Sequence, residues 1–323
     1  MCGLDNPQPL QRLCLDFICH NLDAICVKTC SEIAEEVFED SEDVDMDLNF
    51  ALDQLHKKLE AKISQNEAAK RAERLHFNQE DDQILFHAKL SEELLLRLSD
   101  LGKINDLILT LFDGQKTCLK KVRIENASKL TEIGLQNLQH HNLTDLEVSN
   151  LVKATVNDLI QCLNSWTLEN LKSLNVSNST FVDAQKHTIV VALSKLTNLT
   201  SLNVSGTEFN KTSLEMIMED LPKLENLDIS NTKVRDISAL IKAKNRLKSL
   251  SIAELRLSGT PMLHMETLAQ LENLRHLDIS ENTENRTEIF ESLLPNAKLN
   301  VSEFLVEFAT SLPHLVSLDI SGK

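Results

Sequence analysis

The chain has 323 residues, of which 42% are apolar, and it carries a formal net charge of −16 at pH 7. This charge disfavours binding to nucleic acid or to anionic membrane surfaces, because both present negative phosphate groups. No run of about 20 apolar residues is present, so no membrane-spanning helix is expected. The first residues lack the basic leader of a signal peptide, which predicts a location in the cytoplasm, the nucleus or both.

The first predicted element is a helix over residues 7–26. Asn6 can cap it, and Pro7 and Pro9 fall in its first turn, where a missing N–H costs little. Apolar residues recur at steps of three and four, which places them along one stripe of the helix. The members of this stripe are Leu10, Leu13, Cys14, Phe17, Ile18, Leu22 and Ile25.

Residues 31–117 contain no repeat and are predicted to form an acidic linker followed by a helical cap. Between Ser31 and Leu48 there are nine acidic and no basic residues, which is typical of a solvated segment. Residues 50–80 are predicted as a charged surface helix. A second apolar helical run, Ile84–Leu111, is expected to cover the first repeat, because the end of a solenoid otherwise exposes its core.

From residue 119 onward one phrase, Leu-x-x-Leu-x-(Val/Ile), recurs at steps of mostly 23 to 28 residues. This is the period of leucine-rich repeats. The sequence therefore predicts an α/β solenoid over residues 118–323, with each phrase as one strand of a parallel sheet and helices on the outer face. Outer helices are expected at 188–196, 212–221 and 301–312. The eight phrases begin at Leu119, Leu143, Leu171, Leu199, Leu224, Leu247, Leu274 and Leu315.

Polar residues between the apolar positions of each strand are expected on the concave face of this solenoid. Two interpretations of them are open: a solvated polar surface, or an acidic groove for a basic or polar partner. These residues are Glu147, Asn175, Asn203, Asp228, His276, Asp278 and Asp319.

Catalytic and metal-binding motifs are absent from the sequence: there is no GxSxG, P-loop, GxGxxG, HExxH or CxxC. The seven cysteines are odd in number, which indicates reduced thiols rather than a disulfide framework. We therefore expect a non-enzymatic protein that needs no cofactor and no metal and whose partners are proteins. A zinc site is not expected near the start, because one helix would point the candidate ligands in several directions. These candidates are Cys14, Cys19, His20, Cys26 and Cys30.

The pattern Pro9-Leu10-x-x-x-Cys14-x-x-x-Ile18 resembles the elongin C-binding box of substrate receptors in cullin–elongin ubiquitin ligases. Positions 10, 14 and 18 lie about one helical turn apart, so they form a single ridge that can enter a groove. An ordinary helix that faces the core is the alternative. The expected elongin C contacts are Pro9, Leu10, Leu13, Cys14, Phe17 and Ile18.

Longer segments at 13–22, 227–252, 274–280 and 312–323 resemble the zyg-eleven family, which includes the zyg-eleven-related proteins. This resemblance implies a substrate receptor of a cullin-2 RING ubiquitin ligase. Residues 1–30 would then bind elongin C, with elongin B, and the repeats would serve the recognition of protein substrates. Members of the family recognise protein N-termini, notably an exposed glycine.

Two features depart from the family pattern. The cullin-contacting box of the family has a hydrophobic residue followed by Pro, whereas the best match here has Ser91 at that place and offers Leu90 and Leu94 as contacts. The family also continues into an armadillo-like domain that carries the degron pocket, and this sequence ends at Lys323, so no degron-binding residue is assigned. The alternative function is a leucine-rich scaffold without a link to a ligase.

Overall fold

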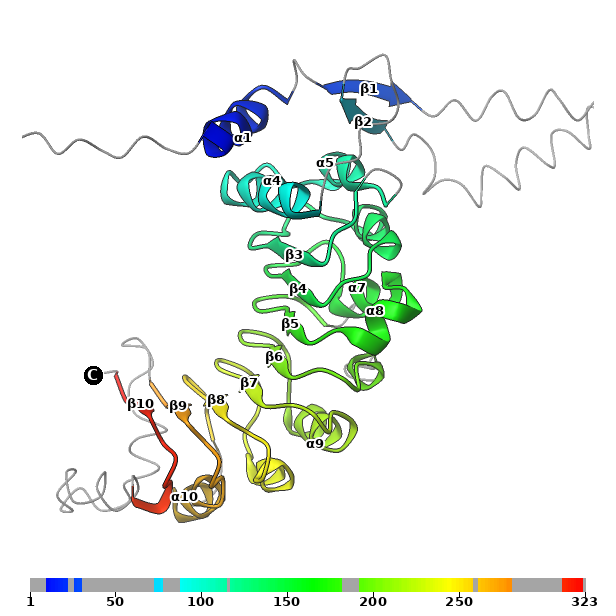
Figure 1. Cartoon of the computed structure of the whole chain (residues 1–323). Helices are drawn as coiled ribbons and strands as arrows, with labels where there is room; N and C mark the ends of the chain where they lie inside the picture. Colours follow the sequence, from blue (N-terminus) through cyan, green and yellow to red (C-terminus); the bar gives the residue numbers. More distant parts are fainter. Residues whose placement is uncertain are drawn as a thin grey trace, which may run out of the picture.

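The computed structural model describes residues 10–22, 26–30, 73–77, 88–114, 117–181, 192–257, 261–280 and 310–321. The described repeats form a curved solenoid, with strands on its inner side and helices on its outer side (Figure 1). The acidic linker at 31–48, most of the helix predicted at 301–312 and the first part of that predicted at 188–196 lie outside the described residues.

Eight strands stack in chain order into one parallel sheet, which confirms the predicted fold class. The second leucine of each phrase pairs with its equivalent in the next repeat, as Leu146 does with Leu174 and Leu174 with Leu202. The predicted register is therefore the observed one. The strands are β3 (Lys121–Ile124), β4 (Asp145–Val148), β5 (Ser173–Asn175), β6 (Ser201–Asn203), β7 (Asn226–Asp228), β8 (Ser249–Ser251), β9 (His276–Asp278) and β10 (Ser317–Asp319).

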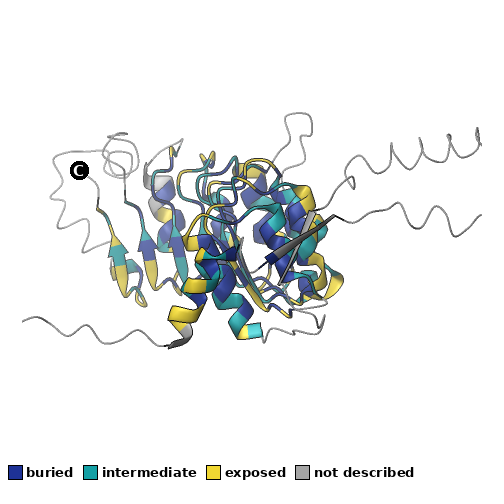
Figure 2. Cartoon of the chain, turned by 90° about the horizontal axis from the view of Figure 1, so that it is seen from above, coloured by how far each residue is buried: buried dark blue, intermediate teal, exposed yellow. Residues whose placement is uncertain are grey.

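The apolar positions of each phrase form the core between sheet and helices. From β3 to β9 they are at most 4% exposed, because each repeat covers the apolar face of its neighbour. The equivalent residues of β10, Leu315, Leu318 and Ile320, are only partly buried. Figure 2 shows the same contrast between the buried interior and the more exposed last strand.

Short helices and 3-10 turns connect the strands on the outer side. Several begin at a side-chain cap, as α9 does at Asn210, whose Oδ1 accepts the backbone N–H of Ser213. Helix α9 confirms the helix predicted at 212–221. The connecting elements are α6 (Glu132–Leu135), η2 (Gln136–His140), α7 (Val156–Cys162), α8 (Ser165–Asn170), η3 (Leu193–Lys195), α9 (Lys211–Asp220), η4 (Ser238–Ala243) and α10 (Pro261–Ala269). Before the first strand, α5 (Asp106–Leu109) and η1 (Thr110–Phe112) lead from α4 (Ala88–Asp100) to β3.

A residue with positive φ follows five successive strands, and its backbone N–H donates to a carbonyl of the next repeat. Glycine and asparagine tolerate this left-handed conformation better than other residues. At Gly206 an added Cβ would lie 2.1 Å from Asn178 Oδ1, so only glycine fits without a shift. The five positions are Asn150, Asn178, Gly206, Asn231 and Glu254.

Glu254, with φ 57°, is the member of this series whose side chain suits the conformation least. We expect Glu254→Asn to raise the free energy of unfolding by about 0.5–1 kcal/mol, because asparagine reaches the left-handed region at lower cost. Urea denaturation of both proteins measures the difference. The reverse substitution, Asn231→Glu, should lower stability by a similar amount. An unchanged urea midpoint in both variants would contradict the backbone explanation.

The N-terminal region differs from the prediction in two places. Helix α1 (Leu10–His20) ends six residues earlier than predicted, and β1 (Cys26–Cys30) pairs antiparallel with β2 (Glu73–Phe77). The amide side chain and backbone N–H of Asn21 both bond to the carbonyl of Phe17, which closes the helix. The extension of the first helix to residue 26 and the helix predicted over 73–77 were therefore wrong, because strand pairing between distant segments overrode the local helical pattern.

Helix α4 (Ala88–Asp100) lies between α1 and the first strand of the repeats (Figure 1). Leu95 and Leu98 of this helix are fully buried in the common core. Its polar side chains bond to the backbone at both ends of β3: Glu92 Oε1 accepts the N–H groups of Lys120 and Lys121, and Ser99 Oγ accepts that of Glu125. Helix α4 thus covers the edge of the sheet at its first strand.

Candidate protein-binding surfaces

Helix α1 presents one apolar face to the protein and another to solvent. Leu15 and Cys19 are at most 2% exposed and belong to the core, as does Leu22 just after the helix. Leu13 and Phe17, one turn apart on the opposite side, are 52% and 63% exposed. At 3.6 residues per turn, these two pairs of positions fall on opposite sides of the helix axis. A single helix therefore packs inward on one side and leaves an apolar ridge exposed on the other.

The predicted elongin C contacts divide between these faces. Cys14 is exposed, whereas Ile18 is partly buried and packs against the core. Pro9 and the side chain of Leu10 lie outside the described part of the structure. The exposed ridge that the structure defines is Leu13, Cys14 and Phe17, which we call the α1 outer face.

Polar contacts tie the last turn of α1 to the residues around α4. Lys103 Nζ donates to the carbonyl oxygen of Cys19 at 2.6 Å, and Arg97 Nε lies 3.6 Å from Asp16 Oδ1. A cation at the end of a helix is favourable because the last carbonyl groups carry partial negative charge. Burial, followed by the nearby charge of Asp16, raises the pKa of the Cys19 thiol, which stays neutral among apolar neighbours.

The segment predicted to contact a cullin is largely buried against other parts of the chain. Leu94 is 2% exposed and Ser91 is 1% exposed, while Leu90 is partly buried against the core. Glu92 is bonded to the backbone before β3. Since Leu94 is a core residue, we leave its side chain out of any partner surface.

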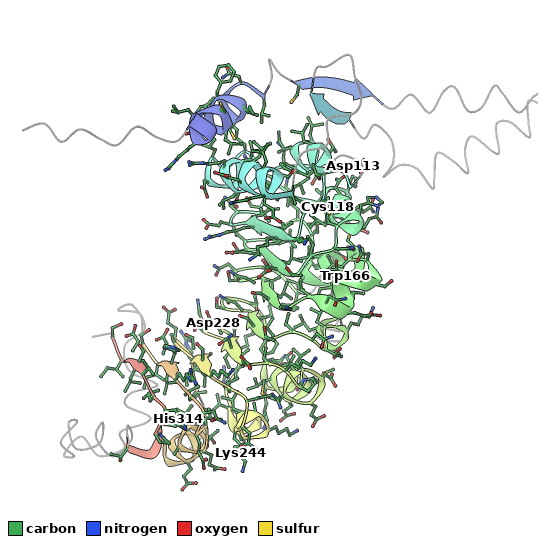
Figure 3. All side chains as sticks on the ribbon, viewed as in Figure 1. Asp113, Cys118, Trp166, Asp228, Lys244 and His314 are labelled. Carbon is green, nitrogen blue, oxygen red and sulfur yellow. The ribbon has the colours of Figure 1, made fainter. Side chains whose placement is uncertain are left out.

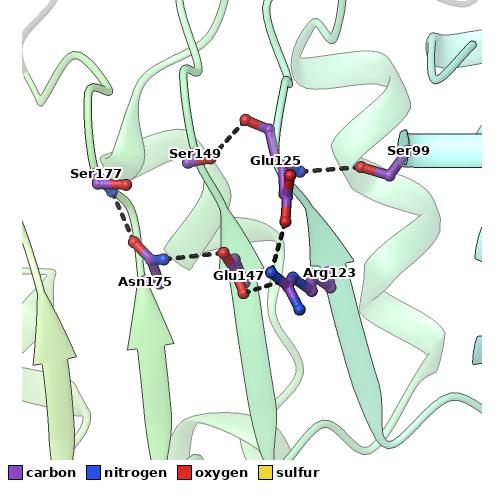
Figure 4. Close-up of polar contacts among 7 residues, drawn as sticks. All are labelled: Ser99, Arg123, Glu125, Glu147, Ser149, Asn175 and Ser177. Carbon is purple, nitrogen blue, oxygen red and sulfur yellow. Dashed lines mark hydrogen bonds and ion pairs between the residues drawn. The ribbon is translucent and has the colours of Figure 1, made fainter. Parts of the chain in front are cut away.

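Two of the predicted concave residues, Glu147 of β4 and Asn175 of β5, bond to each other and join a network with Arg123 of β3. Arg123 contacts Glu125 and Glu147, and Asn175 Nδ2 donates to Glu147 Oε1 at 3.0 Å (Figure 4). Asp228 is on the concave side, whereas Trp166 and Lys244 are on the convex side (Figure 3). At this end of the sheet, the charge of Arg123 partly offsets the charges of Glu125 and Glu147.

Most of the predicted concave residues form a hydrogen bond between their side chain and the nearby backbone. In each case a side-chain oxygen accepts the backbone N–H two residues later, a turn that ends the strand. His276 is exposed, and Ser251 Oγ donates to Asp278 Oδ2 at 2.8 Å. The turn-forming pairs are Asn175 with Ser177, Asn203 with Ser205, Asp228 with Ser230, Asp278 with Ser280, and Asp319 with Ser321.

These turns favour the interpretation of the concave face as a solvated polar surface whose Asp and Asn side chains stabilise the ends of the strands. Each Asp or Asn closes its own repeat, so its presence needs no ligand to explain it. The backbone and side-chain hydrogen bonds to Ser321 lower the pKa of Asp319, which shows the same local bonding at the last strand.

Neither a metal cluster nor a membrane span is found in the part of the chain that the structure describes. No three His, Cys, Asp or Glu side chains lie close enough there to hold a metal ion. None of the helices described is both long enough and apolar enough to cross a bilayer.

The parallel sheet of leucine-rich phrases, with helices on its outer side, defines a leucine-rich-repeat protein. Within this class, residues 215–323 match the family model of Zer-1-like leucine-rich repeats. That match covers the C-terminal part of the chain, from α9 to the last strand.

Solved structures with a similar fold include two bacterial proteins. An internalin from Listeria monocytogenes has 18% identity and a TM-score of 0.39, and the match covers 69% of each chain. A leucine-rich-repeat protein from Leptospira interrogans has 17% identity and a TM-score of 0.31, with 67% of this chain and 56% of that chain covered. Both likenesses concern the repeat architecture alone.

Sequence reasoning missed the residues that hold α1 in place. Lys103 and Arg97 stand in a region predicted only as an apolar helical run, and their partners lie about 80 residues earlier in the chain. Glu92 lies between Ser91 and Leu94 in the match to the cullin box, and the sequence pattern gave it no role. A helix capping an open sheet edge needs acceptors for the free N–H groups of the first strand, and this requirement could have pointed to Glu92.

Proposed function

We propose that this protein is a substrate-receptor or adaptor subunit of a ubiquitin ligase, which binds elongin C, together with elongin B, through the α1 outer face. The observation that carries the proposal is the 52% and 63% exposure of Leu13 and Phe17 on a helix whose other side is fully packed. Large apolar side chains that project together from a fixed helix are suited to a hydrophobic groove on a partner.

The sequence of α1 supports elongin C as that partner. Leu10, Cys14 and Ile18 follow the spacing of the elongin C-binding box, and exposed Cys14 lies beside the ridge of Leu13 and Phe17. A small residue between two large ones allows the backbones of two helices to approach closely. The partly buried Ile18 contributes to the edge of this surface rather than to its centre.

The repeats support the same proposal from the other end of the chain. Their match to Zer-1-like repeats over 215–323 accords with the resemblance to the zyg-eleven and zyg-eleven-related substrate receptors. Membership of that family would make cullin-2 and its RING subunit the further partners. We assign no residue to the cullin contact, because Leu94 and Ser91 are buried.

The mechanism would be positional, and the chain would perform no chemistry itself. Helix α1 would attach the protein to the elongins, and the solenoid would hold a protein substrate, or a substrate-binding region, near the ubiquitin-loading end of the ligase. The transfer of ubiquitin would belong to the RING subunit and its conjugating enzyme. Such a complex would act in the cytoplasm or the nucleus.

Co-purification of elongins B and C with the full chain tests the proposal. We expect the double variant Leu13→Ala plus Phe17→Ala to lose elongin binding, because each apolar anchor at the centre of an interface contributes about 2 kcal/mol or more. Together these losses correspond to a drop in affinity of several hundred-fold or more, on the basis of about tenfold per 1.4 kcal/mol. Titration calorimetry with the purified elongin B–C complex measures the change.

Two matched controls separate the surface from the fold. Val152→Ala removes a side chain of similar exposure, 61%, in the repeats and should leave elongin binding unchanged. Thermal melts should show that the double variant keeps wild-type stability, because both side chains point to solvent. Elongin binding that persists in the double variant would refute the docking site, and the chain would then be better described as a scaffold without a ligase link.

A further inference from the structure

Helix α4 takes the place of a strand at the open edge of the solenoid. In later repeats the two N–H groups at the start of a strand share one carbonyl of the preceding repeat: those of Thr144 and Asp145 both donate to Lys120 O. In the first repeat the equivalent groups of Lys120 and Lys121 share Glu92 Oε1, at 2.9 and 3.0 Å. Helix α4 is therefore fixed to the repeats by hydrogen bonds that follow the pattern of the sheet itself.

The other side of α4 holds α1. Leu15 and Cys19 of α1, and Leu22 just after it, share one core cluster with the leucines of α4. Apolar packing of this kind does not by itself fix a rotation, because it is non-directional. Lys103, which follows α4, adds a directional contact at the C-terminus of α1, and Arg97 adds a second one turn earlier through Asp16.

We infer that α4 is a coupling helix, in which Lys103 and Arg97 are positioning residues that hold α1 at a fixed orientation to the solenoid. The α1 outer face then has a fixed orientation relative to the repeats. A protein bound there and a protein held by the repeats would keep a constant relative placement. This last consequence rests on the proposed function, whereas the coupling itself concerns only this chain.

The distance distribution between α1 and the repeats tests the coupling in the full chain. Spin labels on the exposed Cys14 of α1 and on an engineered Glu169→Cys of α8 report that distance by pulsed electron paramagnetic resonance. Glu169 is exposed on the solenoid, so the label does not disturb the core. Serine replaces Cys2, Cys30, Cys118 and Cys162, while Cys19 and Cys26 are buried and are kept.

We expect one narrow distance distribution in the otherwise unchanged chain. In the double variant Arg97→Met plus Lys103→Met, which keeps the length of both side chains, the distribution should become roughly twofold broader, because the remaining apolar contact leaves α1 free to rotate. Lys129→Met is the matched control: Lys129 Nζ also donates to a backbone carbonyl, but to that of Gly102 rather than to one of α1. The control should give the narrow distribution.

An equally narrow distribution in the double variant, or a broad one in the unchanged chain, would overturn the coupling. A second measurement separates this inference from the proposed function. The double variant leaves Leu13 and Phe17 in place, so elongin affinity should stay within about twofold of the unchanged chain. If the proposed function were wrong, elongin binding would not depend on Leu13 and Phe17. The distance measurement would still test the coupling in that case.

Discussion

Replacing Phe209 with alanine is expected to lower the free energy of unfolding by about 3–5 kcal/mol. Phe209 and Phe181 come from consecutive repeats, are 0% exposed, and have ring centroids 6.4 Å apart at an interplanar angle of 54°. Deletion of one ring leaves a cavity and also removes a tilted aromatic pair, which alone contributes about 0.5–1.5 kcal/mol. Because a solenoid is stabilised by contacts between neighbours, the loss falls on a repeat-to-repeat interface. Urea denaturation followed by circular dichroism measures it.

Two further variants make this prediction specific. Phe209→Leu keeps most of the apolar volume and should cost roughly 1–2 kcal/mol. Ile133→Ala removes a side chain that is 42% exposed and should change stability by no more than about 0.5 kcal/mol. If Phe209→Ala behaved like Ile133→Ala, the phenylalanine pair would contribute little to the stacking of repeats.

The repeated phrase was sufficient to predict the solenoid, because its apolar residues obey one rule in every copy. The first leucine, the second leucine and the Val or Ile all face inward, so a single burial requirement recurs at each repeat. Strand register follows at once, since equivalent leucines must lie side by side. The pattern holds for β10 as well, although its apolar residues are less buried than those of the inner strands.

The end of α1 and the strands β1 and β2 could not be predicted in the same way. Cys26–Cys30 and Glu73–Phe77 pair across a long stretch of sequence, and neither strand has an alternating pattern strong enough to show it. The direct evidence against a continuous helix is Asn21, whose amide can bond to a carbonyl of the last turn. The same residue type also occurs inside helices, so it indicates an end without proving one.

The apolar stripe of α1 was predicted as one surface, and the structure divides it into two. Helical periodicity gives the direction of each side chain from the axis but not the identity of the neighbour on each side. Leu15 was left out of the stripe, yet it is 2% exposed, while Phe17 from the stripe is 63% exposed. Only the position of α4 decides this, and that position depends on contacts such as Lys103 with Cys19, 84 residues apart.

Acidification is expected to destabilise the protein through His141, a buried histidine between η2 and β4. His141 is 1% exposed; Nε2 lies 2.6 Å from the carbonyl oxygen of Phe112, and Nδ1 accepts the backbone N–H of Leu119 at 3.3 Å. This pair of contacts requires the neutral ring with its proton on Nε2, because a protonated Nδ1 would face a donor. Burial, as the largest cause, lowers the pKa of His141; the positive charge of His140 acts in the same direction, whereas the Phe112 carbonyl and Asp113 oppose it.

The sign of the effect follows from proton linkage. In the unfolded chain His141 titrates near pH 6.5, and in the folded chain it titrates at a lower pH, so below about 6.5 the unfolded state binds the extra proton. The contribution of His141 to stability is complete above that pH and is lost as pH falls toward the folded pKa. The slope approaches about 1.4 kcal/mol per pH unit between the two pKa values. Urea midpoints measured from pH 7.5 to 5.0 give this slope.

The variant His141→Gln isolates the contribution of the imidazole. Glutamine can donate to the Phe112 carbonyl and accept from the Leu119 N–H, but it does not titrate, so its stability should depend less steeply on pH below 6.5. His140→Gln is the matched control: that ring is exposed, and its replacement should leave most of the acid dependence in place. Equal pH slopes in the wild type and His141→Gln would mean that other groups cause the acid sensitivity. A flatter slope in His141→Gln alone would show that the buried ring of His141 causes the acid sensitivity. Because this ring bonds to Phe112 and to Leu119, its protonation would weaken the contacts at the start of the solenoid.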